Sequence, residues 1–106
     1  MPIYNKLVRD KIPQIIEASG KSYKSRLLEK DEYVKELRVK LCEEADEYLQ
    51  AGESKEALEE LADLMEVIRA LAYVHGSNEA ELEQIRSDKA RKRGGFQERV
   101  YLIEVD

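Results

Sequence analysis

The chain has 106 residues and a formal net charge of −5, with 39% charged and 42% hydrophobic residues and no tryptophan. This composition is typical of a charged helical protein of one domain, over residues 1–106, and it argues against a β-sandwich and against a nucleic-acid partner, which needs a basic surface. The single cysteine, the early charges near the N-terminus and the lack of an apolar run of about 18 residues favour a cytoplasmic protein that makes no membrane contact.

Glycines divide the chain into four predicted helices, which cover residues 10–19, 31–51, 54–75 and 78–93. Pro13 falls in the first turn of the first helix, where a missing N–H costs little. Asp31 is the expected N-cap of the second helix. His75, just before Gly76, is expected to cap the third. The fold class is therefore all-α, an antiparallel bundle of about four helices.

The C-terminal residues 99–105, RVYLIEV, differ from the rest because they are rich in β-branched residues and partly alternating. This pattern predicts a short strand. The only plausible partner is the segment YKSRLL at residues 23–28. We therefore expect at most one short β-hairpin beside the helices.

The acidic stretch LCEEADEYLQ, residues 41–50, divides its carboxylates between two faces of the second helix. Its apolar stripe consists of Val34, Leu37, Leu41, Ala45 and Tyr48. At 3.6 residues per turn, Glu44 lies roughly 60° from Leu41 and Glu47 roughly 120° on the same side, whereas Glu43 lies roughly 160° away. Glu44 and Glu47 therefore border the core, and Glu43 is expected to face water.

The third helix is apolar on most sides after Asp63, which predicts that most of its sides are buried. Glu60 and Asp63 do not lie on its narrow polar face. They continue the apolar line of Val67, Leu71 and Val74 instead. Because this apolar surface is wider than one thin bundle covers, we expect a homodimer or a higher oligomer.

Each of these two helices offers an i, i+3 pair of carboxylates, namely Glu44 with Glu47 and Glu60 with Asp63. The short turn near Gly52 makes the helices antiparallel neighbours, so the four acids meet at one end of the hairpin. Partly buried carboxylates repel one another, and they either take up protons or bind cations. Oxygen ligands alone suit Mg²⁺, with Mn²⁺ as the alternative. From the pattern alone, a solvated surface or ion pairs with the fourth helix also explain these acids.

Three segments occur in an order that matches a known family: YNKLVRDKIP, then EEADE with ELAD, then KRGGFQERVYL. The central pair fits the motif E-E-x-x-E … E-x-x-D, and the segments extend over nearly the whole chain. The sequence resembles the all-α nucleoside triphosphate pyrophosphohydrolases, which include MazG-like proteins and phosphoribosyl-ATP pyrophosphohydrolase. The terminal segments are similar to those of a short, single-domain branch of the MazG-like group.

The resemblance implies a helical bundle whose acids hold Mg²⁺. The implied reaction is hydrolysis of the α–β phosphoanhydride of a nucleoside triphosphate or related nucleotide, giving monophosphate and pyrophosphate. The implied metal ligands and catalytic residues are Glu44, Glu47, Glu60 and Asp63. Glu43 matches the first letter of the motif but ranks lower because it faces away. The alternative function is a non-catalytic helical dimerisation or nucleotide-sensing module.

A triphosphate also needs basic side chains to neutralise its charge. The candidate substrate-binding residues are Lys89, Arg93, Arg9 and Lys11. Lys89 follows Leu82 and Ile85 by i+7 and i+4, so it shares their inward line, and Arg93 lies one turn further. Cations at a helix C-terminus also stabilise the helix itself, which is the alternative explanation for this basic end. The lone Cys42 is expected to be a half-buried small apolar residue.

Overall fold

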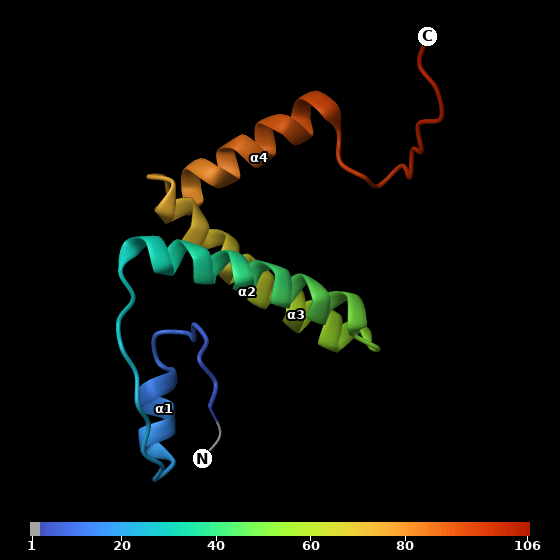
Figure 1. Cartoon of the computed structure of the whole chain (residues 1–106). Helices are drawn as coiled ribbons and strands as arrows, with labels where there is room; N and C mark the ends of the chain where they lie inside the picture. Colours follow the sequence, from blue (N-terminus) through green and yellow to red (C-terminus); the bar gives the residue numbers. More distant parts are fainter. Residues whose placement is uncertain (1–2) are drawn as a thin grey trace.

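The computed structural model describes residues 3–106, and it is all-α as predicted. Its helices are α1 (Ile12–Ala18), α2 (Lys30–Gln50), α3 (Ser54–Val74) and α4 (Glu79–Arg93) (Figure 1). Each predicted helix is present, with both ends within two residues of the prediction. Across residues 3–106, no helix is both long enough and apolar enough to cross a bilayer.

Some of the helix ends follow from local chemistry. Pro13 lies in the first turn of α1, and His75 is the C-cap of α3, both as predicted. At the start of α4, Asn78 Oδ1 accepts a hydrogen bond of 2.8 Å from the Glu81 backbone N–H, which satisfies a donor that the helix leaves free. The prediction for Asp31 was wrong, because α2 begins one residue earlier, with Glu29 as an N-cap that makes no side-chain hydrogen bond.

The packed part of the molecule is the antiparallel hairpin of α2 and α3 (Figure 1). Leu37 of α2 and Ala72 of α3 form its buried apolar core, with 4% and 8% of their surface exposed. Helix α4 contacts α3 but not α2, and α1 contacts no other helix. The hairpin is therefore the scaffold on which any site of this chain has to be built.

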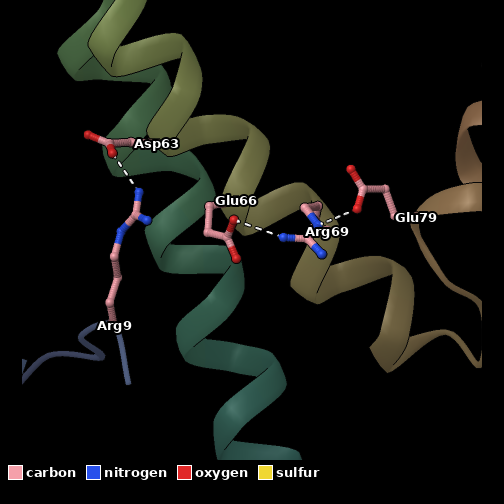
Figure 2. Close-up of polar contacts among 5 residues, drawn as sticks. All are labelled: Arg9, Asp63, Glu66, Arg69 and Glu79. Atoms are coloured by element: carbon pink, nitrogen blue, oxygen red, sulfur yellow. Dashed lines mark hydrogen bonds and ion pairs between the residues drawn. The ribbon is translucent and has the colours of Figure 1, made fainter. Parts of the chain in front are cut away.

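Helix α4 is attached to the end of α3 by an ion-pair bridge (Figure 2). Arg69 Nη1 lies 3.3 Å from Glu66 Oε1 on the same helix, and Arg69 Nε lies 2.8 Å from Glu79 Oε2 at the start of α4. These side chains are 42–57% exposed, so the bridge contributes little stability by itself. Helix α4 then runs away from the hairpin (Figure 1).

The expected β-hairpin was wrong, because residues 3–106 contain no strand. Residues 23–28 lie in the linker before α2, whereas residues 99–105 lie in a tail on the other side of the molecule (Figure 1). No turn joins the two segments, and an isolated pair of strands is only marginally stable in water. A local β-propensity was therefore not enough to form a sheet here.

The prediction that α3 is buried on most sides was also wrong for a single chain. Among its residues only Ala72 is buried, and Met65 is 62% exposed. The accessible surface is 9992 Å², whereas a compact monomer of this mass exposes about 6,100 Å². The radius of gyration is 18.0 Å, against about 13 Å for a compact domain of this length. One chain is thus extended rather than compact, and it leaves several apolar side chains of α3 exposed.

The Asn78 cap gives a test of how α4 begins. Replacing Asn78 with Ala removes the acceptor for the Glu81 N–H and should destabilise the first turn by about 1 kcal/mol. We expect amide hydrogen exchange in that turn to become about five-fold faster. Asn78→Asp keeps an acceptor oxygen and should retain the wild-type rate. Equal exchange rates in Asn78→Ala and the wild type would show that the cap is not what orders this turn.

Candidate metal centre

Three carboxylates from the two packed helices converge on one small volume. Glu44 and Glu47 come from α2 and Glu60 comes from α3, and one oxygen of each lies within 4.8 Å of the others. The antiparallel pairing brings them together, because residues just before the turn of the hairpin face residues just after it. The structure therefore gathers three of the four acids that the sequence singled out.

Burial of two carboxylate oxygens distinguishes this cluster from ordinary helix surface. Glu44 is only 9% exposed, and its Oε2 atom is buried without a hydrogen-bond partner. Oε2 of Glu60 is buried and unpartnered in the same way. Withdrawing a carboxylate oxygen from water without a partner is unfavourable. The cluster thus has oxygen atoms for which a proton or a cation is the missing partner.

The pKa values of the cluster show the same crowding. Hydrogen bonding of protonated Glu60 to Glu47, then burial, then the charges of the neighbouring acids raise the pKa of Glu60 to about 7. For Glu44, burial is the largest cause of a raised pKa, and Glu47 and Asp63 add to it, while Lys40 acts in the opposite direction. Near neutral pH, Glu60 is therefore protonated in a fraction of the molecules, and a cation that binds the cluster would displace this proton.

Asp63, the fourth expected acid, is engaged elsewhere. Arg9 Nη2 donates a hydrogen bond of 2.6 Å to Asp63 Oδ1, from the segment that precedes α1 (Figure 2). Asp63 nevertheless lies close enough for its charge to raise the pKa of Glu44 and of Glu60. Sequence reasoning placed Arg9 among the substrate-binding candidates and missed this pairing, because nothing in the spacing links positions so far apart.

Glu43 and Cys42, which precede Glu44 on α2, lie outside the cluster. Glu43 does not belong to the converging group, and its Oε2 atom lies 3.5 Å from Lys40 Nζ on the same helix. Cys42 is exposed, so the prediction of a half-buried residue was wrong. Both line a shallow groove on the outside of α2, on a face that no other helix of residues 3–106 covers.

The remaining basic candidates do not reach the acids within one chain. Leu82 and Ile85 line a groove against α3, but Lys89 is exposed, so its predicted inward position was wrong. Arg93 is exposed as well, and α4 makes no contact with the helix that carries Glu44 and Glu47. The divergence of α4 from α3 explains this difference (Figure 1). Lys11 is exposed at the start of α1.

Comparisons with known proteins give little further information. No protein-family model and no solved structure matches the chain. It is similar to an uncharacterized protein of Mycolicibacterium smegmatis, with 47% identity over 51 residues. The match covers 48% of this chain and 51% of the relative, so the chain spans about half the length of that relative. The resemblance to the MazG-like enzymes is not tested by these results and stays a prediction.

The raised pKa of Glu60 predicts how the metal-free protein responds to pH. Because its folded pKa of about 7 lies above the ordinary 4.5, its contribution to stability is present below pH 4.5 and is lost as the pH rises through 7. Glu60→Gln removes this loss. We compare the melting temperatures of Glu60→Gln and the wild type in the presence of a chelator. The difference, Glu60→Gln minus wild type, should increase from pH 5 to pH 8.

Glu43→Gln is the matched control, because it removes an equal charge from a residue outside the converging group. It should not reproduce the increase expected for Glu60→Gln, because Glu43 lies outside the crowded carboxylates. A constant difference for Glu60→Gln would contradict the crowding that we describe.

Proposed function

We propose that the protein is a metal-dependent hydrolase that cleaves the α–β phosphoanhydride of a nucleoside triphosphate or a related nucleotide. The observation that supports this most is the convergence of Glu44, Glu47 and Glu60 with two buried, unpartnered oxygens. A purely structural helix pair gains nothing from such crowding, because like charges and desolvation both disfavour it. The resemblance to the MazG-like enzymes supports the same reaction. We propose a cytoplasmic location as well.

The residues of the cluster fit a hard divalent cation. They offer oxygen atoms only, and no histidine or cysteine belongs to the converging group, which favours Mg²⁺ or Mn²⁺. Glu44, Glu47 and Glu60 would hold the ion, with Asp63 beside them on α3. When bound, such an ion polarises phosphoryl oxygens and makes water a better nucleophile.

The chain's own residues have two tasks in this reaction. The carboxylates would hold an ion that positions the triphosphate. Hydrolysis adds water across the α–β phosphoanhydride, so that this bond breaks and monophosphate and pyrophosphate are released. Basic side chains neutralise the phosphate charge. Of the four basic candidates, Arg9 is the one that reaches an acid of this site in the same chain. Lys89 and Arg93 would have to act from a neighbouring copy.

A homodimer or higher oligomer is part of the proposal. The exposed apolar side chains of α3 include Leu58, Leu61, Met65 and Ile68. A second copy is the simplest cover for these side chains, since a contiguous apolar face is unfavourable in water.

The proposed reaction is tested by measuring nucleotide turnover in variants that replace a carboxylate with an amide. Glu44→Gln and Asp63→Asn each remove a negative charge from the site, and we expect at least about a 100-fold loss of kcat with Mg²⁺. Glu43→Gln is the matched control, because Glu43 does not belong to the converging group, and it should stay close to the wild type. The assay follows pyrophosphate release from a panel of common and modified nucleoside triphosphates.

The products distinguish the proposal from its alternatives. Monophosphate and pyrophosphate are expected, whereas orthophosphate as the primary product would mean cleavage at the γ position. Binding of nucleotide and Mg²⁺ without any product would favour the nucleotide-sensing module instead.

The open face of α3 gives a separate test of assembly. We expect sedimentation at micromolar concentration to give a dimer or larger species rather than a monomer of 12.3 kDa. Met65→Glu places a charge on the exposed apolar face and should shift the protein toward the monomer. Leu27→Glu makes the same chemical change at a 97% exposed residue outside the helices and should leave the assembly intact. A wild-type monomer would contradict the proposal.

A further inference from the structure

A single ion pair joins the N-terminal segment, residues 3–11, to the helical hairpin. Arg9 Nη2 lies 2.6 Å from Asp63 Oδ1 (Figure 2), whereas every other ion pair within residues 3–106 joins positions at most ten apart. Helix α1, which follows this segment, makes no contact with another helix. Within residues 3–106, this pair is therefore the ion-pair contact between the segment and the hairpin.

Asp63 belongs to two arrangements at once. It lies one helical turn after Glu60 on α3, which places it beside the converging carboxylates. Its side chain is 43% exposed, so it has room to turn from the guanidinium toward the cluster. The Arg9 guanidinium supplies Asp63 with the positive charge that a divalent cation would supply. One carboxylate therefore has two cationic partners competing for it.

We propose that Arg9 is the resident counter-ion of the acidic cluster. In the metal-free protein it pairs with Asp63, and it gives way when a divalent cation takes Asp63 as a further ligand. This inference rests on the proposed function, because it requires the cluster to bind a cation. Arg9 is thus a positioning residue for Asp63, and metal binding and docking of residues 3–11 oppose each other.

Linkage fixes the sign and limits the size of this effect. If the cation releases Arg9, then Arg9 must weaken binding of the cation by the same factor. Arg9 and Asp63 are 58% and 43% exposed, and exposed ion pairs are weak, so the factor should be about two- to five-fold. A weak pair suits the role, because a strong one would keep the cation out. Once released, the guanidinium can form paired hydrogen bonds to phosphate oxygens.

Calorimetric titration of the full chain with Mg²⁺ tests the proposal without any turnover. Arg9→Gln should bind Mg²⁺ about two- to five-fold more tightly than the wild type, because the cation no longer displaces a partner of Asp63. Lys11→Gln removes the same charge two residues away, from a side chain that forms no ion pair within residues 3–106. It should bind Mg²⁺ with nearly wild-type affinity.

The guanidinium signals of Arg9 in an NMR spectrum give a direct second readout, and their loss in Arg9→Gln assigns them. Mg²⁺ should move these signals in the wild type to the positions that they occupy in metal-free Asp63→Asn, where Arg9 has no acid to pair with. Unchanged signals on saturation with Mg²⁺ would overturn the exchange of partners.

The outcomes separate this inference from the proposed function. If Arg9→Gln and Lys11→Gln bind Mg²⁺ more tightly by the same factor, the effect comes from the net charge of the protein, and the role of Arg9 is overturned. Wild-type affinity in Arg9→Gln would overturn it as well, and the metal-binding cluster would stand in both cases. A wild-type protein that binds no Mg²⁺ would remove the inference and the proposed function together.

Discussion

Repulsion among the carboxylates of the α2–α3 hairpin explains the charge state and the ion pairing of the residues around them. Glu44, Glu47 and Glu60 are held within 4.8 Å of one another by the packing of two helices, not by attraction between the acids. A raised pKa lets Glu60 keep a proton near neutral pH. Arg9 arrives from a distant part of the sequence to pair with Asp63. Both responses reduce negative charge where the fold concentrates it.

The scaffold that imposes this crowding is thin. Leu37 and Ala72 are the buried apolar residues of the hairpin, while α1 lies apart and α4 leaves α3 after its first turns. A small core has little stability to spare for buried charges. Retaining unpartnered oxygens on such a scaffold therefore favours a role in binding, because a structural role is served better by apolar residues. The open face of α3 also leaves room for a second copy to enlarge the core.

The candidate substrate-binding residues lie near the two ends of the chain, and these ends are placed differently relative to the acids. The N-terminal segment returns to the hairpin through Arg9, so its charge reaches the acids of the same chain. The basic end of α4 points away from them, and its last turn carries Arg91, Lys92 and Arg93, where the helix dipole favours cations. Of the four basic candidates, Arg9 is therefore the one that contacts an acid of the proposed site within residues 3–106.

The sequence by itself determined the helices and the faces of the acids, because both follow from periodicity and local punctuation. Proline, asparagine and glycine set helix ends through backbone geometry, and a turn of 100° per residue separates Glu44 from Glu43 wherever the helix lies. The short turn near Gly52 likewise determined that α2 and α3 pair. The resemblance to the MazG-like enzymes suggested the proposed reaction, which helical periodicity cannot indicate.

Only the tertiary structure decided which charges meet. Arg9 and Asp63 are 54 positions apart, and no local rule couples them, so their pairing depends on the path of the whole N-terminal segment. Lys89 was placed inward by its spacing, but an inward line has meaning only while two helices stay in contact. Helix α4 diverges from α3 (Figure 1), and Lys89 is exposed. The tail of residues 99–105 failed to form a strand for the same reason. Helical periodicity is a property of one segment, whereas a contact requires two segments to arrive at the same place.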